Sequence, residues 1–294
     1  MSEPKFDLNV TLSLFDGISC GQEALKKAGI STRIFLASEI EKYPKMITRK
    51  NHPLTVQLGD VTKVVADDLP HVNLLMGGSP CQGFSFAGKQ LNFDDPRSAL
   101  FFEFVRLLKE CKPDYFLLEN VMMKQEYQDI ITEHLGVEPV MINSALVSAQ
   151  SRKRLYWTNI LGVSQPENKG IVLKDVLEDG VVDRDKSHCL DANYYKGGNL
   201  KSYFEKHRRQ LVFNKPICGR IVGRRINPET GKRDDYNPDL KAEQRLEPRL
   251  DEKTGTLTTV QKDNVVVDGP TYRKLSAIEC ERLQTLPDNY TEGV

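Results

Sequence analysis

The segment GGSPCQGFSFAGK, residues 77–89, places a cysteine where a side chain has little opportunity to pack. Cys81 follows Pro80 among several glycines and comes directly after the apolar run VNLLM of residues 72–76. The proline and the glycines favour a loop over a packed thiol, and the other cysteines lack the spacing of metal ligands. A loop thiol becomes a nucleophile when its pKa is lowered or when an acid or base lies beside it. We therefore predict that Cys81 is a nucleophile.

The segment LLEN, residues 117–120, supplies an acid for this nucleophile. Glu119 ends an apolar, strand-like run, where burial is expected to raise the pKa of a carboxyl group so that it holds or donates a proton. A carboxylate that only caps a loop is the alternative. Together, Glu119 and Cys81 make a candidate pair of acid and nucleophile.

Two arginines alternate in the segment QSRKRLYW, residues 150–157. In an extended segment, alternate side chains point to the same side, so Arg152 and Arg154 would present two guanidinium groups together, next to Gln150. Such a pair suits a carbonyl oxygen, a carboxylate or a phosphate. A basic run on the surface is the alternative.

The segment FDGISCG, residues 15–21, indicates a site for a nucleoside cofactor. Gly17 and Gly21 flank a turn where the backbone has to approach a ligand closely, although the full GxGxxG pattern is absent. Glu39 lies 22 residues after Gly17, where a carboxylate accepts hydrogen bonds from ribose hydroxyls. Asp60 suits an adenine amino group on the same edge. A purely structural turn is the alternative.

These residues need a frame that brings strand ends together. Apolar runs predict strands over 10–15, 33–40, 72–80, 114–121, 139–147 and 154–161, and helical periodicity marks 22–29 and 98–111. Strands that alternate with helices indicate an α/β fold with a mostly parallel sheet, which binds ligands at the carboxyl ends of its strands. The candidate residues above all fall at such ends.

Composition places the chain among ordinary globular proteins. Its 294 residues are 39% hydrophobic and 28% charged, with a formal net charge of zero, which argues against nonspecific binding of nucleic acid. Six cysteines, at positions 20, 81, 111, 189, 218 and 280, show neither CxxC nor zinc spacing, so we expect free thiols and no metal. Without an apolar run of membrane-spanning length or a signal peptide, we expect no membrane and a cytoplasmic location.

The chain changes character after Pro166. Residues 166–270 are rich in Gly, Asn, Asp and Arg and carry short strand-like runs, which indicates a smaller domain of strands and loops. Residues 201–225 hold eight Lys or Arg against one acid, a net charge of +7. Contacts to phosphates are one explanation, with aromatic support from Tyr194, Tyr195 and Tyr203, and a solvated face is the other.

The order of FDGISCG, SEI, GDV, GGSPCQGFS, LFFEFVRLL, LLENV and QSRKR resembles the cytosine-C5 DNA methyltransferases, and RKLSAIECERLQTLPDNY (273–290) resembles a late motif of that family. The Pro-Cys-Gln and Glu-Asn-Val elements are the most specific. The resemblance implies a Rossmann-like sheet that binds S-adenosylmethionine, with a smaller target-recognition domain of strands and loops. The implied domains are a catalytic and cofactor-binding domain over 1–165, target recognition over 166–270 and a return segment over 271–294.

The resemblance also implies a mechanism. The Cys81 thiolate attacks C6 of a cytosine flipped out of double-stranded DNA, Glu119 holds or protonates N3, and Arg154 contacts O2, with Arg152 in the same catalytic group. C5 then takes the methyl group of S-adenosylmethionine, which becomes S-adenosylhomocysteine. The implied cofactor-binding residues are Phe15, Asp16, Gly17, Ile18, Glu39, Ile40, Asp60, Val61, Ser79, Pro80 and Leu100. The resemblance implies DNA contacts by Gln82, Ser85 and Arg97, and the basic run over 201–225 adds Arg208, Arg209, Arg224 and Arg225 as expected DNA-binding residues.

Two other functions stay open. The related tRNA cytosine methyltransferases share the catalytic loop, and a DNA-binding homologue without catalysis would share the fold. Such enzymes serve restriction-modification, phage protection or regulation, so a bacterial or phage-infected cell is the expected setting. Members of the family ordinarily continue beyond the late motif, so we expect a further segment, in the same polypeptide or from a second chain, and an apolar groove beside Leu14 and Phe15 that it fills.

Overall fold

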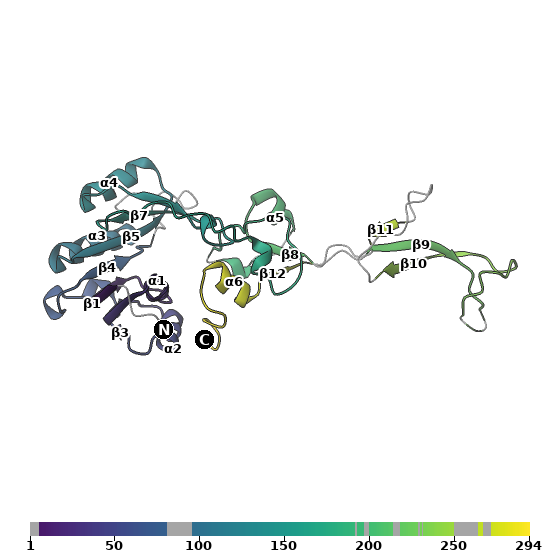
Figure 1. Ribbon diagram of the computed structural model, residues 1–294, viewed down its shortest axis with the longest axis horizontal. Helices are drawn as coiled ribbons and strands as arrows, with labels where there is room; N and C mark the ends of the chain where they lie inside the picture. Colours follow the sequence, from purple (N-terminus) through teal and green to yellow (C-terminus); the bar gives the residue numbers. More distant parts are fainter. Residues whose placement is uncertain are drawn as a thin grey trace. The chain divides into compact units, whose positions relative to one another are not determined.

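The computed structural model describes residues 6–80, 96–191, 193–196, 200–213, 218–228, 230, 232–249, 264–266 and 272–294 (Figure 1). The chain divides into two compact units. The first unit comprises Met1–Val176, Lys186–Cys189 and Ser276–Val294, and the second comprises Leu177–Asp185 and Leu190–Leu275. None of the helices in the described ranges combines the length and apolar character needed to cross a bilayer.

A seven-stranded sheet forms the centre of the first unit, with the order β3-β2-β1-β4-β5-β7-β6. Its strands are β1 (Phe6–Leu14), β2 (Ile30–Ser38), β3 (Val56–Gln57), β4 (Leu74–Gly77), β5 (Tyr115–Val121), β6 (Val140–Asn143) and β7 (Lys153–Thr158). The first five strands of the chain pair in parallel, whereas β7 pairs antiparallel with both β5 and β6. The chain moves outward from β1 through β2 to β3 and then crosses to β4 on the other side of β1. This reversal leaves a crevice at the carboxyl ends of β1 and β4, which is where such sheets bind ligands.

The predicted mostly parallel α/β sheet is confirmed. The helices of the first unit are α1 (Cys20–Ala28), α2 (Lys42–Asn51), α3 (Pro96–Cys111), α4 (Gln125–Leu135) and α6 (Ala277–Leu283), with 3₁₀ turns η1 (Val61–Lys63), η2 (Ala66–Asp68), η3 (Ser144–Leu146) and η4 (Leu173–Asp175). Helix α1 ends at Gly29, as predicted, with a left-handed φ of 72°. Helices α2, α4 and α6 were not predicted.

One face of the sheet carries the main core. Leu75, Leu118 and Trp157 of the strands belong to one buried cluster with Phe104 of α3 and Ile131 of α4. Burial of each such side chain contributes about 1.5–3 kcal/mol to the free energy of unfolding. The cluster therefore fixes the strand ends that carry the candidate residues.

The opposite face meets α1. A Cβ atom on Gly21 would lie 2.7 Å from the Met76 Cε atom, so a larger residue here would require the end of the flexible Met76 side chain to move. An apolar cavity of about 890 Å³ also opens on this face, lined by residues that include Leu25, Met76, Leu117 and Tyr156. The groove was expected beside Leu14 and Phe15; neither residue lines this cavity, and Leu14 is fully buried.

The second unit consists of short elements. A three-stranded sheet has the order β10-β9-β11, and β12 pairs with β8. The bounds are η5 (Tyr194–Lys196), α5 (Leu200–Lys206), β8 (Leu211–Phe213), β9 (Cys218–Arg224), β10 (Glu243–Arg249), β11 (Asn264–Val266) and β12 (Tyr272–Lys274).

Candidate active site

The β1–α1 turn, residues 15–19, has an unusual backbone. Phe15, Gly17 and Ser19 have positive φ angles of 56°, 59° and 60°. Glycine tolerates this region, whereas the other two residues are held there at some cost in free energy. The turn therefore depends on the side chains that bind its peptide groups.

Asp16 supports this turn from inside. Its carboxylate accepts hydrogen bonds from the Ser13 hydroxyl at 2.7 Å and from the Ser19 hydroxyl. Burial raises the pKa of Asp16, while the two serine hydroxyls oppose that shift. The Asp16 oxygens thus stabilise the turn through the two serines, which is an alternative to the predicted role of Asp16 in cofactor binding.

Glu39 joins the β1–α1 turn to the end of β2. One carboxylate oxygen accepts from the Gly17 amide at 2.8 Å, and the other accepts from the Ile40 and Glu41 amides, each at 2.8 Å. A carboxylate has about four lone-pair sites, so three amides leave about one for another donor. The residue predicted to bind a ribose therefore also shapes the backbone around it.

A cavity of about 360 Å³ lies at the carboxyl ends of the strands. Seven of the predicted cofactor-binding residues line it, namely Phe15, Glu39, Ile40, Asp60, Val61, Pro80 and Leu100. Its lining also includes residues that the sequence did not single out, namely Ser38, Glu41, Gly59 and Gly78. The other predicted residues, Asp16, Gly17, Ile18 and Ser79, are not part of the lining. The structure thus gathers most of the predicted set around one cavity.

Asp60 and α3 fix the far rim of this cavity. The Asp60 Oδ1 atom accepts from the amide and the hydroxyl of Thr62, at 3.0 and 2.9 Å. The hydrogen bond from the Thr62 backbone amide is the main cause of the lowered pKa of Asp60, so this carboxylate is ionised at neutral pH. Arg106 of α3 donates to the carbonyl oxygens of Val61 and Val64, at 3.2 and 3.1 Å, and so holds the turn that follows Asp60.

Glu119 lies within a cluster of charges at the end of β5. Its Oε1 atom is 2.7 Å from the Arg154 Nε atom and 3.7 Å from an Arg152 guanidinium nitrogen. The antiparallel pairing of β5 with β7 produces this arrangement. It sets Val121 opposite Arg154, and Glu119 lies two residues before Val121 on the same face of β5, diagonal to Arg154. A Cβ atom on Gly78 would lie 2.9 Å from the Glu119 Oε2 atom. The structure therefore brings Glu119, Arg152 and Arg154 together beside the end of β4.

The predicted nucleophile, Cys81, follows the end of β4 in the sequence. Pro80 lines the cavity and directly precedes Cys81 in the sequence. Ser79 is buried and accepts a hydrogen bond from the Asn120 amide group at 3.3 Å, which ties the end of β4 to β5. Cys81, Gln82 and Ser85 lie outside the described residues, as does the side chain of Arg97.

The predicted DNA-binding arginines of the second unit are not all free. Arg208 is exposed, whereas the other three are half-buried. The Arg209 Nε atom is 3.7 Å from Asp191, and an Arg224 nitrogen is 3.4 Å from the Asp235 carboxylate. The remaining arginine, at position 225, donates from its side chain to the carbonyl oxygens of residues 235 and 240. Charge counting along the sequence therefore overestimates the positive charge available to a ligand.

The expected aromatic support from Tyr203 was wrong. Tyr203 is 1% exposed, and its hydroxyl donates to Asp183 at 2.5 Å and accepts from Gln210 at 2.8 Å. Tyr194 donates to the Gln210 carbonyl oxygen at 2.6 Å, whereas Tyr195 is 66% exposed. Both bonded tyrosines hold the second unit together, because a buried hydroxyl needs a partner.

Within the described part of the chain, no group of three or more His, Cys, Asp or Glu side chains is placed to hold a metal ion. The features that remain are a ligand-sized cavity at the switch point of a parallel sheet and a carboxylate–arginine cluster at the neighbouring strand ends. They belong to a Rossmann-like α/β fold, which a solved structure of a Spodoptera frugiperda DNMT2 mutant shares. That structure aligns with a TM-score of 0.53 and 21% identity, over 71% of this chain and 75% of the other.

The family follows from sequence comparison. The model of the C-5 cytosine-specific DNA methylase family matches residues 10–294, so the chain belongs to this family. The type II methyltransferase M.Eco47II of Escherichia coli is 31% identical over 320 residues, which cover 98% of this chain and 73% of the relative. The type II methyltransferase M.NlaIV of Neisseria lactamica is 33% identical over 197 residues, which cover 58% of this chain and 46% of the relative. This chain thus spans about half the length of several relatives that it matches.

Proposed function

We propose that the chain transfers a methyl group from S-adenosylmethionine to C5 of cytosine in double-stranded DNA, through a covalent bond to Cys81. The observation that carries the proposal is the position of the Glu119–Arg152–Arg154 cluster. It lies at strand ends next to a cavity whose lining reaches Pro80, one residue before the nucleophile. The family to which the chain belongs supports the same activity.

The cavity fits the proposed cofactor. At about 360 Å³ it is within the range of small-molecule sites, and it combines apolar walls with a few polar groups. Phe15, Ile40 and Leu100 offer apolar contact to a purine ring, and Glu39 and Asp60 offer acceptors for ribose hydroxyls and an amino group. S-adenosylmethionine supplies an activated methyl group on a sulfonium when it is bound.

The chain's own residues activate the cytosine. The thiolate of Cys81 forms a bond to C6, and the electron pair of the C5–C6 double bond becomes available at C5 as the protonated carboxyl group of Glu119 donates its proton to N3. Once C5 has been methylated, a solvent base takes the C5 proton, its electron pair restores the C5–C6 double bond, and the Cys81 sulfur leaves as a thiolate. The N3 proton returns to Glu119, which restores the neutral base. Arg154, in contact with Glu119, would orient that carboxylate and reach the O2 atom of the base.

The choice of nucleic acid decides between the two open enzyme functions. Purified protein is incubated with S-adenosylmethionine labelled in the methyl group and with either duplex DNA or tRNA. We expect label in the duplex at cytosine C5, and bisulfite sequencing of DNA from expressing cells then locates the modified sites. Label in tRNA alone would overturn the proposed substrate, and label in neither would favour a homologue that binds without catalysis.

Glu39→Ala is expected to weaken cofactor binding. The variant loses an acceptor for the ribose and also releases the Gly17 and Ile40 amides, which Glu39 holds through its two oxygens. Loss of one charge-assisted hydrogen bond costs about 1.5–3 kcal/mol. Calorimetry with S-adenosylhomocysteine measures the change, and the exposed Glu133→Ala on α4 is the control for loss of a carboxylate. Equal affinity of Glu39→Ala and wild type would refute the assignment.

We further propose that residues 166–270 recognise the target DNA. Arg208 is exposed, and the Arg209 Nε atom lies 3.7 Å from Asp191, so guanidinium groups of this segment offer several donors in the planar arrangement that suits phosphates. Phosphate contacts position the protein on the duplex, and contacts to base edges provide specificity.

Arg208→Gln is expected to flatten the salt dependence of DNA binding. A lost phosphate contact removes about one released counterion, so the slope of log K against log[salt] falls by about 0.9. Fluorescence anisotropy at several salt concentrations measures this slope. Arg33→Gln, an exposed arginine of β2, is the matched control and should leave the slope unchanged. An Arg208→Gln slope equal to that of wild type would mean that this arginine faces only solvent.

A further inference from the structure

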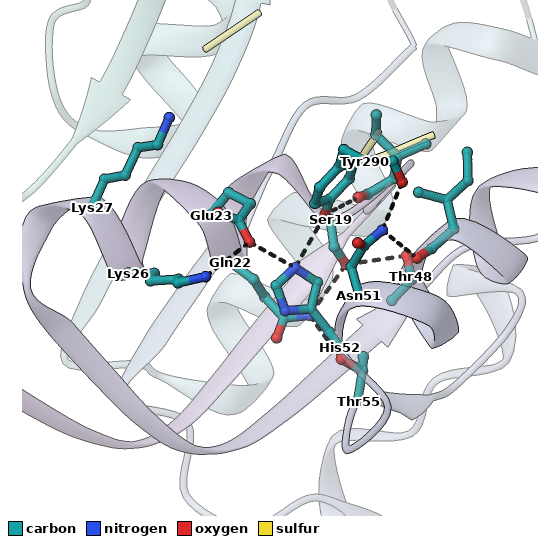
Figure 2. A network of polar contacts seen from close by, with 12 residues as sticks. Ser19, Gln22, Glu23, Lys26, Lys27, Thr48, Asn51, His52, Thr55 and Tyr290 are labelled. Carbon is teal, nitrogen blue, oxygen red and sulfur yellow. Dashed lines mark hydrogen bonds and ion pairs between the residues drawn. The ribbon is translucent and has the colours of Figure 1, made fainter. Parts of the chain in front are cut away.

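A polar network joins three segments that are far apart in the sequence, namely α1, α2 and the segment 286–292 (Figure 2). Glu23 of α1 is 5% exposed and Tyr290 is 2% exposed. The His52 Nε2 atom, directly after α2, is 3.4 Å from the Glu23 carboxylate and 3.1 Å from the Tyr290 hydroxyl. Tyr290 in turn donates to the carbonyl oxygen of Ile18 at 2.8 Å.

The direction of each hydrogen bond follows from the donors available. A carbonyl oxygen only accepts, so the single hydroxyl hydrogen of Tyr290 goes to Ile18, and the Tyr290 oxygen must accept from His52. This places a hydrogen on Nε2 of His52, which faces Glu23 as well. Burial lowers the pKa of His52 and raises the pKa of Tyr290, so the imidazole is neutral and the phenol protonated at neutral pH. The chain of bonds therefore aims the Tyr290 hydroxyl at the β1–α1 turn.

Further bonds fix the segment that carries Tyr290. Asn51 donates to the Tyr290 carbonyl oxygen at 2.9 Å, and the Lys50 amine donates to the carbonyl oxygens of Asn289 and Glu292, both at 2.8 Å. The Tyr290 ring also packs in a small buried cluster with Ile47 and Leu286. Segment 286–292 is thus held to α2 by side chains that bind its backbone.

The turn that receives this hydroxyl needs support. Ile18 lies between Gly17 and Ser19, both with left-handed φ angles, and such conformations persist only where surrounding groups determine them. Glu39 holds the Gly17 amide, and the Thr48 hydroxyl is 3.2 Å from the Ser19 hydroxyl. Tyr290 is the partner that the described structure gives to the Ile18 carbonyl oxygen.

We infer that Tyr290 is a positioning residue for the cofactor, through a clasp formed by segment 286–292 on the β1–α1 turn. The inference rests on the proposed function, because the turn contributes Phe15 to the cavity assigned to S-adenosylmethionine. Tyr290 does not line this cavity, so its effect passes through the Ile18 peptide group. The clasp acts on cofactor binding and leaves the chemistry at cytosine to other residues.

Tyr290→Phe tests the clasp, because it removes one hydroxyl and keeps the buried ring. We expect the Kd for S-adenosylhomocysteine, measured by calorimetry on the whole 294-residue chain, to rise about three- to tenfold, the usual effect of one hydrogen bond. The KM for S-adenosylmethionine should rise equally, with kcat at saturating substrates unchanged. Tyr43→Phe is the matched control, since Tyr43 lies on α2 with 63% exposure, and it should behave as wild type.

Lys50→Met is a second variant, since this lysine is exposed and its loss preserves the buried cluster. It releases the carbonyl oxygens of residues 289 and 292, and a smaller rise in the same Kd is expected. If Tyr290→Phe folds and binds with the Kd of wild type, the clasp is overturned. If Tyr290→Phe does not fold, a Lys50→Met variant with the Kd of wild type overturns the clasp. Neither outcome affects the proposed function. Wild-type protein that binds no S-adenosylhomocysteine overturns the proposed cofactor, and this inference with it.

Discussion

Cys81→Ala is expected to reduce methyl transfer to background while cofactor binding stays close to that of wild type. Without the sulfur atom, no bond forms at C6, so C5 of cytosine never becomes nucleophilic enough to take a methyl group. A duplex with 5-fluorocytosine at the target separates this step from binding. Fluorine replaces the proton that must leave C5, so the adduct of the wild-type protein stays covalently bound to the DNA, as denaturing electrophoresis would reveal.

Cys111→Ala is the control for loss of a thiol. Cys111 is a half-buried free cysteine at the end of α3, where burial raises the pKa of its thiol, so this cysteine is a poor nucleophile at neutral pH. It should methylate DNA and form the adduct as wild type does. A Cys81→Ala variant that still methylates duplex DNA, with S-adenosylhomocysteine bound normally, would contradict the proposed mechanism.

The central sheet could be predicted because short apolar runs mark its strands. Residues 10–14 of β1 and 35–38 of β2 are buried continuously, whereas β5 and β7 alternate buried and partly exposed residues. Strand β1 starts at Phe6 and not at the predicted position 10. Its first residues are mostly exposed, with burial only at Leu8, so no apolar run marks this part of the strand. Helix α4 carries a legible signal, since Tyr127, Ile131 and Leu135 are buried at intervals of four residues. Helix α2 buries only Ile47 and Thr48, which is too little for a periodic pattern.

The candidate site was predictable where a rule of topology applies. Parallel strands end at one edge of a sheet, which is why Glu39, Asp60 and Pro80 line one cavity. Side-chain pairing over long distances follows no such rule. The bond of Tyr290 to Ile18 joins residues 272 apart, and the aspartate partners of Arg209 and Arg224 depend on how the second unit folds.

Gly78→Ala is expected to lower kcat by about 100-fold, a typical cost of misplacing a catalytic group by about 1 Å. Its φ angle is not left-handed, so alanine brings no backbone strain, and the added Cβ atom would lie 2.9 Å from the Glu119 Oε2 atom. That distance is too short for a carbon–oxygen contact, so Glu119 has to move away from the position that its 2.7 Å contact with Arg154 defines. Single-turnover methyl transfer at saturating cofactor and DNA measures the chemical step.

A double-mutant cycle shows whether this effect passes through Glu119. If Gly78→Ala acts by displacing the carboxylate, adding it to Glu119→Gln, which has already lost the acid, should cost far less than it costs in wild type. Gly223→Ala in β9 is the matched control, because its new Cβ atom meets nothing closer than Ala242 Cβ at 3.8 Å, and it should keep the kcat of wild type. Equal losses from Gly78→Ala in both backgrounds would show that the glycine serves the site in a way unrelated to Glu119. The position of Glu119 would then not depend on glycine at residue 78, contrary to the prediction.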